Sequence, residues 1–103
     1  MRFDLAGWGA ELTPERSAIW ANGRWLSYRD VNARAICLAN HLHGMGLGFG
    51  ERVGLLADNH LAHFDLFFAA AKLGFIFVPF DPQHPVAALR DAARVVAPSL
   101  VIS

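Results

Sequence analysis

Three consecutive segments in the second half of the chain differ in the spacing of their hydrophobic positions. Val53–Ala57 is a short apolar run, His60–Leu73 is a longer stretch without Gly or Pro, and Ile76–Val78 begins another short apolar run closed by prolines. Short apolar runs on either side of a long helical segment predict the order strand, helix, strand. A crossover of this length joins parallel strands, and such units are almost always right-handed.

The helix predicted for His60–Leu73 is apolar nearly all the way round. Its apolar residues cannot share one narrow stripe: Leu61, Phe64, Phe67, Phe68, Ala70, Ala71 and Leu73. A helix of this kind is buried on more than one side. We therefore expect the strand–helix–strand unit to lie inside something larger than itself.

A further helix and strand are predicted near the end of the sequence. Val86–Ala97 has apolar residues at helical spacing on one face and charged residues on the other, which predicts an amphipathic helix. Pro98 ends it, and Leu100–Ile102 is predicted to be a third parallel strand. The predicted fold class is α/β, with a three-stranded parallel βαβαβ sheet, flanking helices and an N-terminal β-hairpin in a single domain over residues 1–103.

The hairpin is predicted from Asn22-Gly23, which lies between the short apolar runs Ala18–Ala21 and Arg24–Tyr28. The tight hairpin turn needs positive φ at both central residues, and Asn-Gly supplies it. Earlier in the chain, Gly7 and Gly9 argue against a stable helix.

Thr13-Pro14-Glu15 resembles the first turn of a helix, with Thr13 as the cap. A longer helix is predicted over Tyr28–His43, because Ser27 can cap it and Asp30 suits its positive end. Its buried face is predicted from helical spacing to include Val31, Ala35, Leu38 and Leu42. The glycines that follow are expected to end it and form a loop: Gly44, Gly46, Gly48 and Gly50.

Composition narrows the function classes. Hydrophobic residues make up 54% of the 103 residues, which excludes disorder and gives more apolar surface than one small domain buries easily. The formal net charge is zero and no basic run exists, so nucleic-acid binding has no support. Cys37 is the only cysteine, so no internal disulfide can form. There is no secretory signal pattern and no apolar run of roughly 20 residues, so we expect no membrane span and a cytoplasmic setting.

Three segments, in order and at suitable spacing, carry a family resemblance. Leu26-Ser27-Tyr28-Arg29-Asp30-Val31 resembles the Leu-Thr/Ser-Tyr-x-Glu-Leu motif of the adenylate-forming enzymes, which include acyl-CoA synthetases, peptide-synthetase adenylation domains and luciferases. Gly46-Leu47-Gly48-Phe49-Gly50-Glu51-Arg52-Val53 is similar to their Gly-Val-x-x-Gly-Asp-Arg-Val. Ala71–Pro82 resembles their Leu-Lys-Ala-Gly-x-x-x-Val-Pro-Leu-Asp/Asn-Pro.

The resemblance implies a parent enzyme, of which this chain is a truncated N-terminal subdomain. The parent would use ATP and Mg to convert a carboxylic acid into an acyl-adenylate and would then pass the acyl group to coenzyme A. Fatty acid metabolism is one setting for such a reaction. The family's phosphate loop, nucleotide-binding motifs and catalytic Lys have no counterpart here, so no catalytic, cofactor-binding or metal-binding residue is assigned and the chain alone is expected to be inactive. The alternatives are an amino-acid-activating adenylation domain fragment and a free-standing, non-catalytic interaction module.

Several candidate features have simpler explanations. Gly46-x-Gly48-x-Gly50 follows a helix and opens a strand, the reverse of a dinucleotide-binding fingerprint, so it is interpreted as a helix stop. His60 and His63 are three apart and could share a helix face, but no further metal ligands accompany them. Cys37 lies off the apolar stripe without an activating neighbour and is interpreted as a structural thiol.

The carboxyl ends of the predicted parallel strands are the place where a bound ligand is most expected. In an open parallel sheet, ligands bind beyond the carboxyl ends of the strands. Asp58 and Asn59 follow one predicted strand and Asp81 follows the next. Asn59 is interpreted as a helix cap and Asp81 as a turn residue, and the functional alternative is that all three wall a cleft. Lys72 is expected on the opposite side of the sheet.

Two partners are expected. The remainder of the parent enzyme would cover the apolar faces, and the isolated chain is expected to associate with itself because a sheet cut after Ile102 leaves an open edge.

Overall fold

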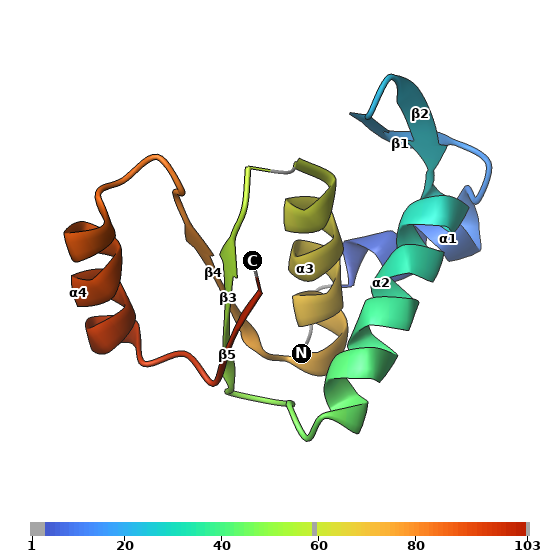
Figure 1. Cartoon of the computed structure of the whole chain (residues 1–103). Helices are drawn as coiled ribbons and strands as arrows, with labels where there is room; N and C mark the ends of the chain where they lie inside the picture. Colours follow the sequence, from blue (N-terminus) through green and yellow to red (C-terminus); the bar gives the residue numbers. More distant parts are fainter. Residues whose placement is uncertain (1–3, 59, 103) are drawn as a thin grey trace.

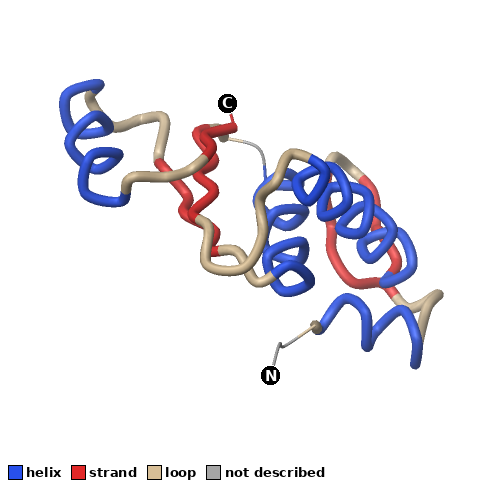
Figure 2. Tube along the Cα trace, turned by 90° about the horizontal axis from the view of Figure 1, so that it is seen from below, coloured by secondary structure: helices blue, strands red, loops and turns tan. Residues whose placement is uncertain are grey.

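The computed structural model describes residues 4–58 and 60–102. In these ranges the elements follow one another along the chain as α1 (Leu5–Leu12), β1 (Ser17–Ala21), β2 (Arg24–Ser27), α2 (Tyr28–Gly44), β3 (Arg52–Leu56), α3 (His60–Leu73), β4 (Ile76–Phe80), α4 (Val86–Val96) and β5 (Leu100–Ile102). Figure 1 shows α4 on one side of the central sheet and α3 with α2 on the other. The view from below gives the same layers (Figure 2).

The central sheet has the strand order β4-β3-β5, and both pairs of neighbours are parallel. The predicted α/β fold with a parallel three-stranded sheet is therefore confirmed. β4 continues to Phe80, two residues beyond the predicted end, and includes Pro79. α4 ends one residue earlier than predicted, because Ala97 takes the left-handed conformation at φ 49° before Pro98.

The hairpin turn and the start of α2 also agree with the sequence analysis. β1 and β2 are antiparallel, and Asn22 and Gly23 join them with φ of 53° and 79°. At α2, the Ser27 hydroxyl accepts a hydrogen bond from the Asp30 N–H at 3.2 Å, and the Asp30 carboxylate accepts one from the Ser27 N–H at 3.4 Å. This reciprocal capping box satisfies two backbone donors at the helix start.

The prediction that the first twelve residues lack a stable helix was wrong, because Leu5–Leu12 forms α1. The Asp4 side chain caps it by accepting from the Gly7 N–H at 3.0 Å. Ala6 is fully buried, and Gly9 lets the helix backbone approach Tyr28 so closely that a Cβ there would lie 2.1 Å from the ring. Tertiary packing therefore outweighs the helix-breaking tendency of the two glycines.

Thr13 closes α1, with its N–H donating to Gly9 O at 2.8 Å, which the sequence analysis did not predict. The turn predicted from Thr13-Pro14-Glu15 follows it, but no helix continues from that turn. The chain then turns through Pro14 and Glu15, and the Arg16 N–H donates to Thr13 O at 3.1 Å. Later in the chain, the glycine-rich segment joins α2 to β3, as predicted, and Gly46 and Gly50 have φ of 88° and 80°.

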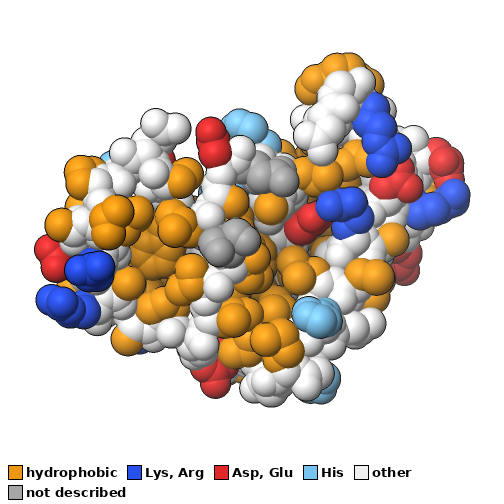
Figure 3. Space-filling model, in the orientation of Figure 1, with side chains coloured by type: hydrophobic (Ala, Val, Ile, Leu, Met, Phe, Trp, Pro, Cys, Tyr) orange, Lys and Arg blue, Asp and Glu red, His pale blue; other side chains and the backbone are white. Residues whose placement is uncertain are grey.

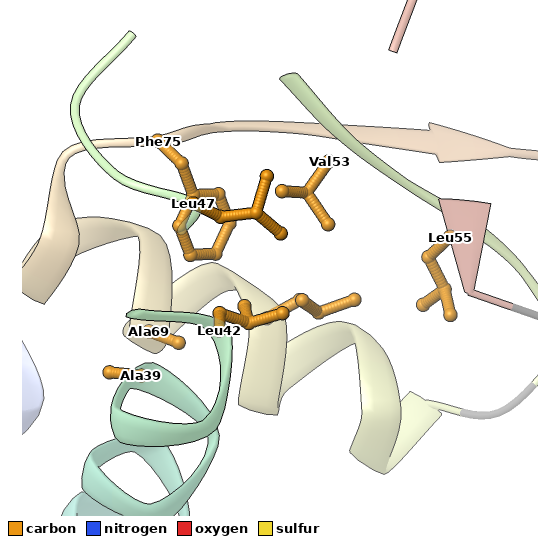
Figure 4. Close-up of a cluster of buried hydrophobic side chains, with 8 residues drawn as sticks. Ala39, Leu42, Leu47, Val53, Leu55, Ala69 and Phe75 are labelled. Atoms are coloured by element: carbon orange, nitrogen blue, oxygen red, sulfur yellow. The ribbon is translucent and has the colours of Figure 1, made fainter. Parts of the chain in front are cut away.

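The main hydrophobic cluster lies between the sheet and the pair α2 and α3 (Figure 4). It joins buried residues of five segments: Ala39, Leu42, Leu47, Val53, Leu55, Leu66, Ala69 and Phe75. A second cluster packs α1 and the hairpin against the same two helices through Ala6, Ala21, Leu26, Val31, Ala35 and Phe68. The buried positions of α2 include three of the four predicted core residues, and Leu38 is partly buried.

The outer layers are less well covered. Phe64 and Phe67 of α3 are 37% and 57% exposed, so this helix is not buried on every apolar side within the described residues. α4 is amphipathic as predicted, but none of its residues is fully buried. The Arg52 guanidinium links α4 to the sheet by donating to Val96 O at 2.9 Å. Within the part of the chain that the structure describes, no helix is long and apolar enough to cross a membrane.

Candidate functional site

The carboxyl ends of β3 and β4 lie side by side, since the parallel ladder ends with Leu56 paired to Phe80. A depression of about 430 Å³ opens at this edge, and its lining residues are Ala57, Asp58, His63, Pro79, Phe80, Asp81 and Pro82. The structure therefore brings Asp58 and Asp81 together, as expected for residues that follow parallel neighbours. Asn59, the third predicted wall residue, lies outside the described residues.

Asp81 holds the turn after β4. Its Oδ1 accepts a hydrogen bond from the Gln83 N–H at 2.9 Å, and its backbone carbonyl accepts one from the His84 N–H at 3.1 Å. This is an Asx turn followed by a β-turn, so the predicted turn role is confirmed. The second carboxylate oxygen lies 3.8 Å from His84 Nε2 and remains on the exposed side.

His63 is a wall residue that the sequence analysis did not identify. It lies in the first turn of α3, and its Nε2 is 3.1 Å from Ala57 O. A carbonyl only accepts, so Nε2 carries a proton and Nδ1 is the nitrogen left for another partner. The ring also packs edge-on against Phe77, with centroids 5.8 Å apart. Its position three residues into the helix that leaves β3 was the available signal.

His60 and His63 do not share a site. His60 lines a separate depression of about 420 Å³ on the hairpin side, together with Trp20, Ala21, Asn22 and Asp58. Asp58 borders both depressions. Among the described residues, no group of three His, Cys, Asp or Glu side chains is arranged to hold a metal ion.

A third depression, of about 530 Å³, lies between α2 and α3 and away from the strand ends. Its lining includes Arg34, Cys37 and Asp65. Arg34 donates from Nε and Nη2 to the two carboxylate oxygens of Asp65 at 2.9 and 2.8 Å, and this hydrogen bonding raises the pKa of Arg34. Cys37 is exposed, but the cation beside it is already engaged by Asp65.

The polar groups at the strand ends do not fit a nucleoside triphosphate. The depression presents the carboxylates of Asp58 and Asp81, whose charge has the same sign as that of phosphate. The turn after β4 contains Pro82 and Pro85, which have no N–H to offer. Lys72 lies at the other end of α3, where its ammonium is 3.1 Å from an Asp4 carboxylate oxygen.

Comparison with known proteins identifies the fold family. The family described as AMP-binding enzyme matches residues 7–103. Feruloyl-CoA synthase from Amycolatopsis sp is 32% identical over 93 residues, which are 90% of this chain and 19% of that protein. Surfactin synthase subunit 1 from Bacillus subtilis is 32% identical over 85 residues, which are 82% of this chain and 2% of that protein. The crystal structure of IdnL1 superposes with a TM-score of 0.85 at 36% identity, covering 97% of this chain and 20% of that one.

The class defined by the α/β fold and these matches is that of the adenylate-forming enzymes, and the chain belongs to the AMP-binding enzyme family. The resemblance carried by the three sequence motifs is therefore confirmed. The chain spans less than a fifth of the length of both relatives named above. Its similarity extends both to acyl-CoA ligases and to peptide synthetases.

Proposed function

We propose that this chain is the opening part of an acid–thiol ligase, which uses ATP and Mg to activate a carboxylic acid as an acyl-adenylate and then transfers the acyl group to coenzyme A. The observation that carries the proposal is the 32% identity to a feruloyl-CoA synthase over 90% of the chain. In this proposal the chain contributes folded scaffold, and the reaction takes place on segments of the parent enzyme that the chain does not contain. The setting is cytoplasmic.

An amino-acid-activating adenylation domain is the second candidate, because surfactin synthase subunit 1 has the same 32% identity over 82% of the chain. The two candidates share the first half-reaction and differ in the acid and in the thiol acceptor. The Asp81 turn supports neither one over the other, since its hydrogen bonds stay within the turn.

The depression at the strand ends is proposed to form one wall of a larger cleft in the parent. Asp58, Asn59 and Asp81 would border it, with His63 beside them, since Asp58, His63 and Asp81 line one depression. Asp81 would act mainly by holding the turn, because one of its carboxylate oxygens is already bonded to the Gln83 N–H.

The test is an assay of the longer protein that contains this chain. With Mg-ATP, pyrophosphate exchange is measured against aromatic acids, fatty acids and amino acids, and then product formation is measured with coenzyme A. Exchange with an aromatic or fatty acid followed by a coenzyme A thioester supports the proposal. Exchange restricted to amino acids, with no thioester of coenzyme A, would favour the adenylation domain. If no acid supports pyrophosphate exchange, the longer protein has no adenylating activity, and the non-catalytic interaction module is favoured.

A further inference from the structure

The backbone carbonyl of Ala57 lies where the sheet stops providing hydrogen bonds. The ladder between β3 and β4 ends with Leu56 paired to Phe80, so Ala57 is the first residue beyond it. Ala57 packs against the main hydrophobic cluster, and Figure 3 shows hydrophobic side chains gathered over the middle of the face, between α4 and the sheet. A carbonyl in apolar surroundings needs a partner from the protein itself, because an unpaired one costs free energy.

His63 supplies that partner from the first turn of α3. Its Nε2 lies 3.1 Å from Ala57 O, and the contact is partly buried. Since a carbonyl only accepts, the Nε2–H is the donor. The ring also meets Phe77 of β4, with centroids 5.8 Å apart and ring planes at 66°, an edge-to-face arrangement that aromatic rings favour. The imidazole therefore fastens the start of α3 to the end of β3 and to the neighbouring strand.

This hydrogen bond determines the direction in which the chain leaves β3. The Ala57 carbonyl and the Asp58 N–H belong to one planar peptide unit, so a donor that holds the carbonyl also places the Asp58 Cα. Asp58 is exposed and lines the strand-end depression together with Asp81. Asp81 is held by its own turn, through the Gln83 N–H. All of these contacts join residues of this chain, so they do not depend on what the longer protein adds.

We propose that His63 is a positioning residue of the cleft wall: by donating from Nε2 to Ala57 O, it keeps Asp58 at the depression that Asp81 also borders. This role rests on the proposed function, in which the depression is one wall of the cleft of a longer enzyme. Histidine meets two requirements here, since its ring packs against Phe77 and its Nε2–H donates. Two substitutions separate them: His63→Phe keeps a ring and removes the donor, whereas His63→Gln removes the ring and keeps an N–H donor on a side chain of similar reach.

Hydrogen exchange of the longer protein that contains this chain, measured by mass spectrometry, tests the fastening. The first N–H groups of a helix have no intrahelical partner, so residues 64–67 carry the amides that report whether the start of α3 (His60–Leu73) is held. We expect His63→Phe to speed hydrogen exchange there, because the helix start is no longer tied to the end of β3. His63→Gln should restore slow hydrogen exchange.

The catalytic consequence is measured on the same variants as kcat/KM for pyrophosphate exchange, with the acid that the longer protein uses best. We expect His63→Phe to lower kcat/KM by between about twofold and tenfold, the range for loss of one neutral hydrogen bond, and His63→Gln to recover most of the loss. Leu42→Val is the control for stability. Leu42 is 1% exposed in the main hydrophobic cluster, so this variant lowers the melting temperature but should leave hydrogen exchange over residues 64–67 and kcat/KM close to the original values.

The proposal is overturned if His63→Phe leaves hydrogen exchange unchanged, if His63→Phe and His63→Gln change it equally, or if Leu42→Val reproduces the effect. Faster hydrogen exchange in His63→Phe with unchanged kcat/KM would make the histidine a structural residue only, and would overturn the positioning role as well. If the unmodified longer protein shows no pyrophosphate exchange with any acid, the proposed function fails. Whether His63 holds the end of β3 is then decided by hydrogen exchange alone.

Discussion

Gly9 is the residue whose replacement should most disturb the packing of α1 on α2. A Cβ at this position would lie 2.1 and 2.5 Å from two carbons at the base of the Tyr28 ring, and that ring is held at the start of α2. Overpacking of this kind costs roughly 1–3 kcal/mol. We therefore expect Gly9→Ala to lower the free energy of unfolding by that amount in a urea titration.

Gly44→Ala is the matched control for that substitution. Gly44 is the last residue of α2, and nothing lies within 4 Å of an added Cβ. Alanine is the better helix former, so the variant should be as stable as the original chain or slightly more stable. Equal destabilisation by both substitutions would show that the close approach of Gly9 to Tyr28 is not what the first helix requires.

The Arg34–Asp65 pair is a polar link between α2 and α3. It is bidentate, and the Asp65 side chain is only 17% exposed, although that of Arg34 is 43% exposed. Because solvent screens the arginine, the expected loss for Asp65→Asn is modest, roughly 1 kcal/mol. A lower urea midpoint is the measurement. Asp91→Asn removes the solvent-exposed pair with Arg94, at 3.8 Å, and should leave the midpoint unchanged.

At the scale of elements, the helices and strands whose hydrophobic residues recur at regular spacing could be predicted from the sequence. α3 begins and ends at the predicted residues, and α2 and β5 are within one residue of the prediction. The failure at α1 has a physical cause: the glycines are unfavourable in an isolated helix, but Gly9 makes room for Tyr28, which lies 19 residues later. Contacts between distant residues carry no local signal. His63 is a different case: its place in the first turn of the helix after β3 was a usable signal, but its contact with Ala57 O depends on how α3 leaves the sheet.

Phe67 and Phe68 of α3 should differ in their effect on stability, although both were predicted to be buried from their place in an apolar helix. Phe68 is 7% exposed and belongs to the second hydrophobic cluster, whereas Phe67 is 57% exposed and meets Phe68 edge-on at 5.4 Å. Phe68→Ala should cost roughly 3–5 kcal/mol as a buried truncation. Phe67→Ala should cost clearly less, because most of its side chain is already in water.

Melting temperatures of the two variants, recorded by circular dichroism in the dilute monomer, compare them directly. Equal shifts would mean that Phe67 is covered in solution. Concentration dependence of the Phe67→Ala melting curve would then place Phe67 in a contact between molecules.

At the scale of the whole molecule, the distribution of apolar surface explains why the chain has an ordered core and uncovered flanks. Both hydrophobic clusters lie on the α2 and α3 side of the sheet. On the other side α4 contributes no fully buried residue, and Ile76 and Val101 are 49% and 45% exposed. The sequence indicated this surplus through its 54% hydrophobic content, but only the structure shows which face is left open.

The last prediction concerns nucleotide binding by this chain alone. A triphosphate needs convergent backbone N–H donors, a cation near the α-phosphate and a place for magnesium. The strand-end depression offers the carboxylates of Asp58 and Asp81 instead of donors. The Lys72 ammonium lies at the far end of α3, 3.1 Å from Asp4. Among the described residues, no group of three side chains is arranged to bind a metal ion. We expect isothermal titration calorimetry with Mg-ATP to give no saturable heat, and no pyrophosphate exchange with any acid. Asp58→Asn with Asp81→Asn, which removes the repulsion but supplies side-chain amides in place of convergent backbone N–H donors, should also fail to bind. Micromolar binding by the original chain would show that it contains a nucleotide site of its own and is more than scaffold.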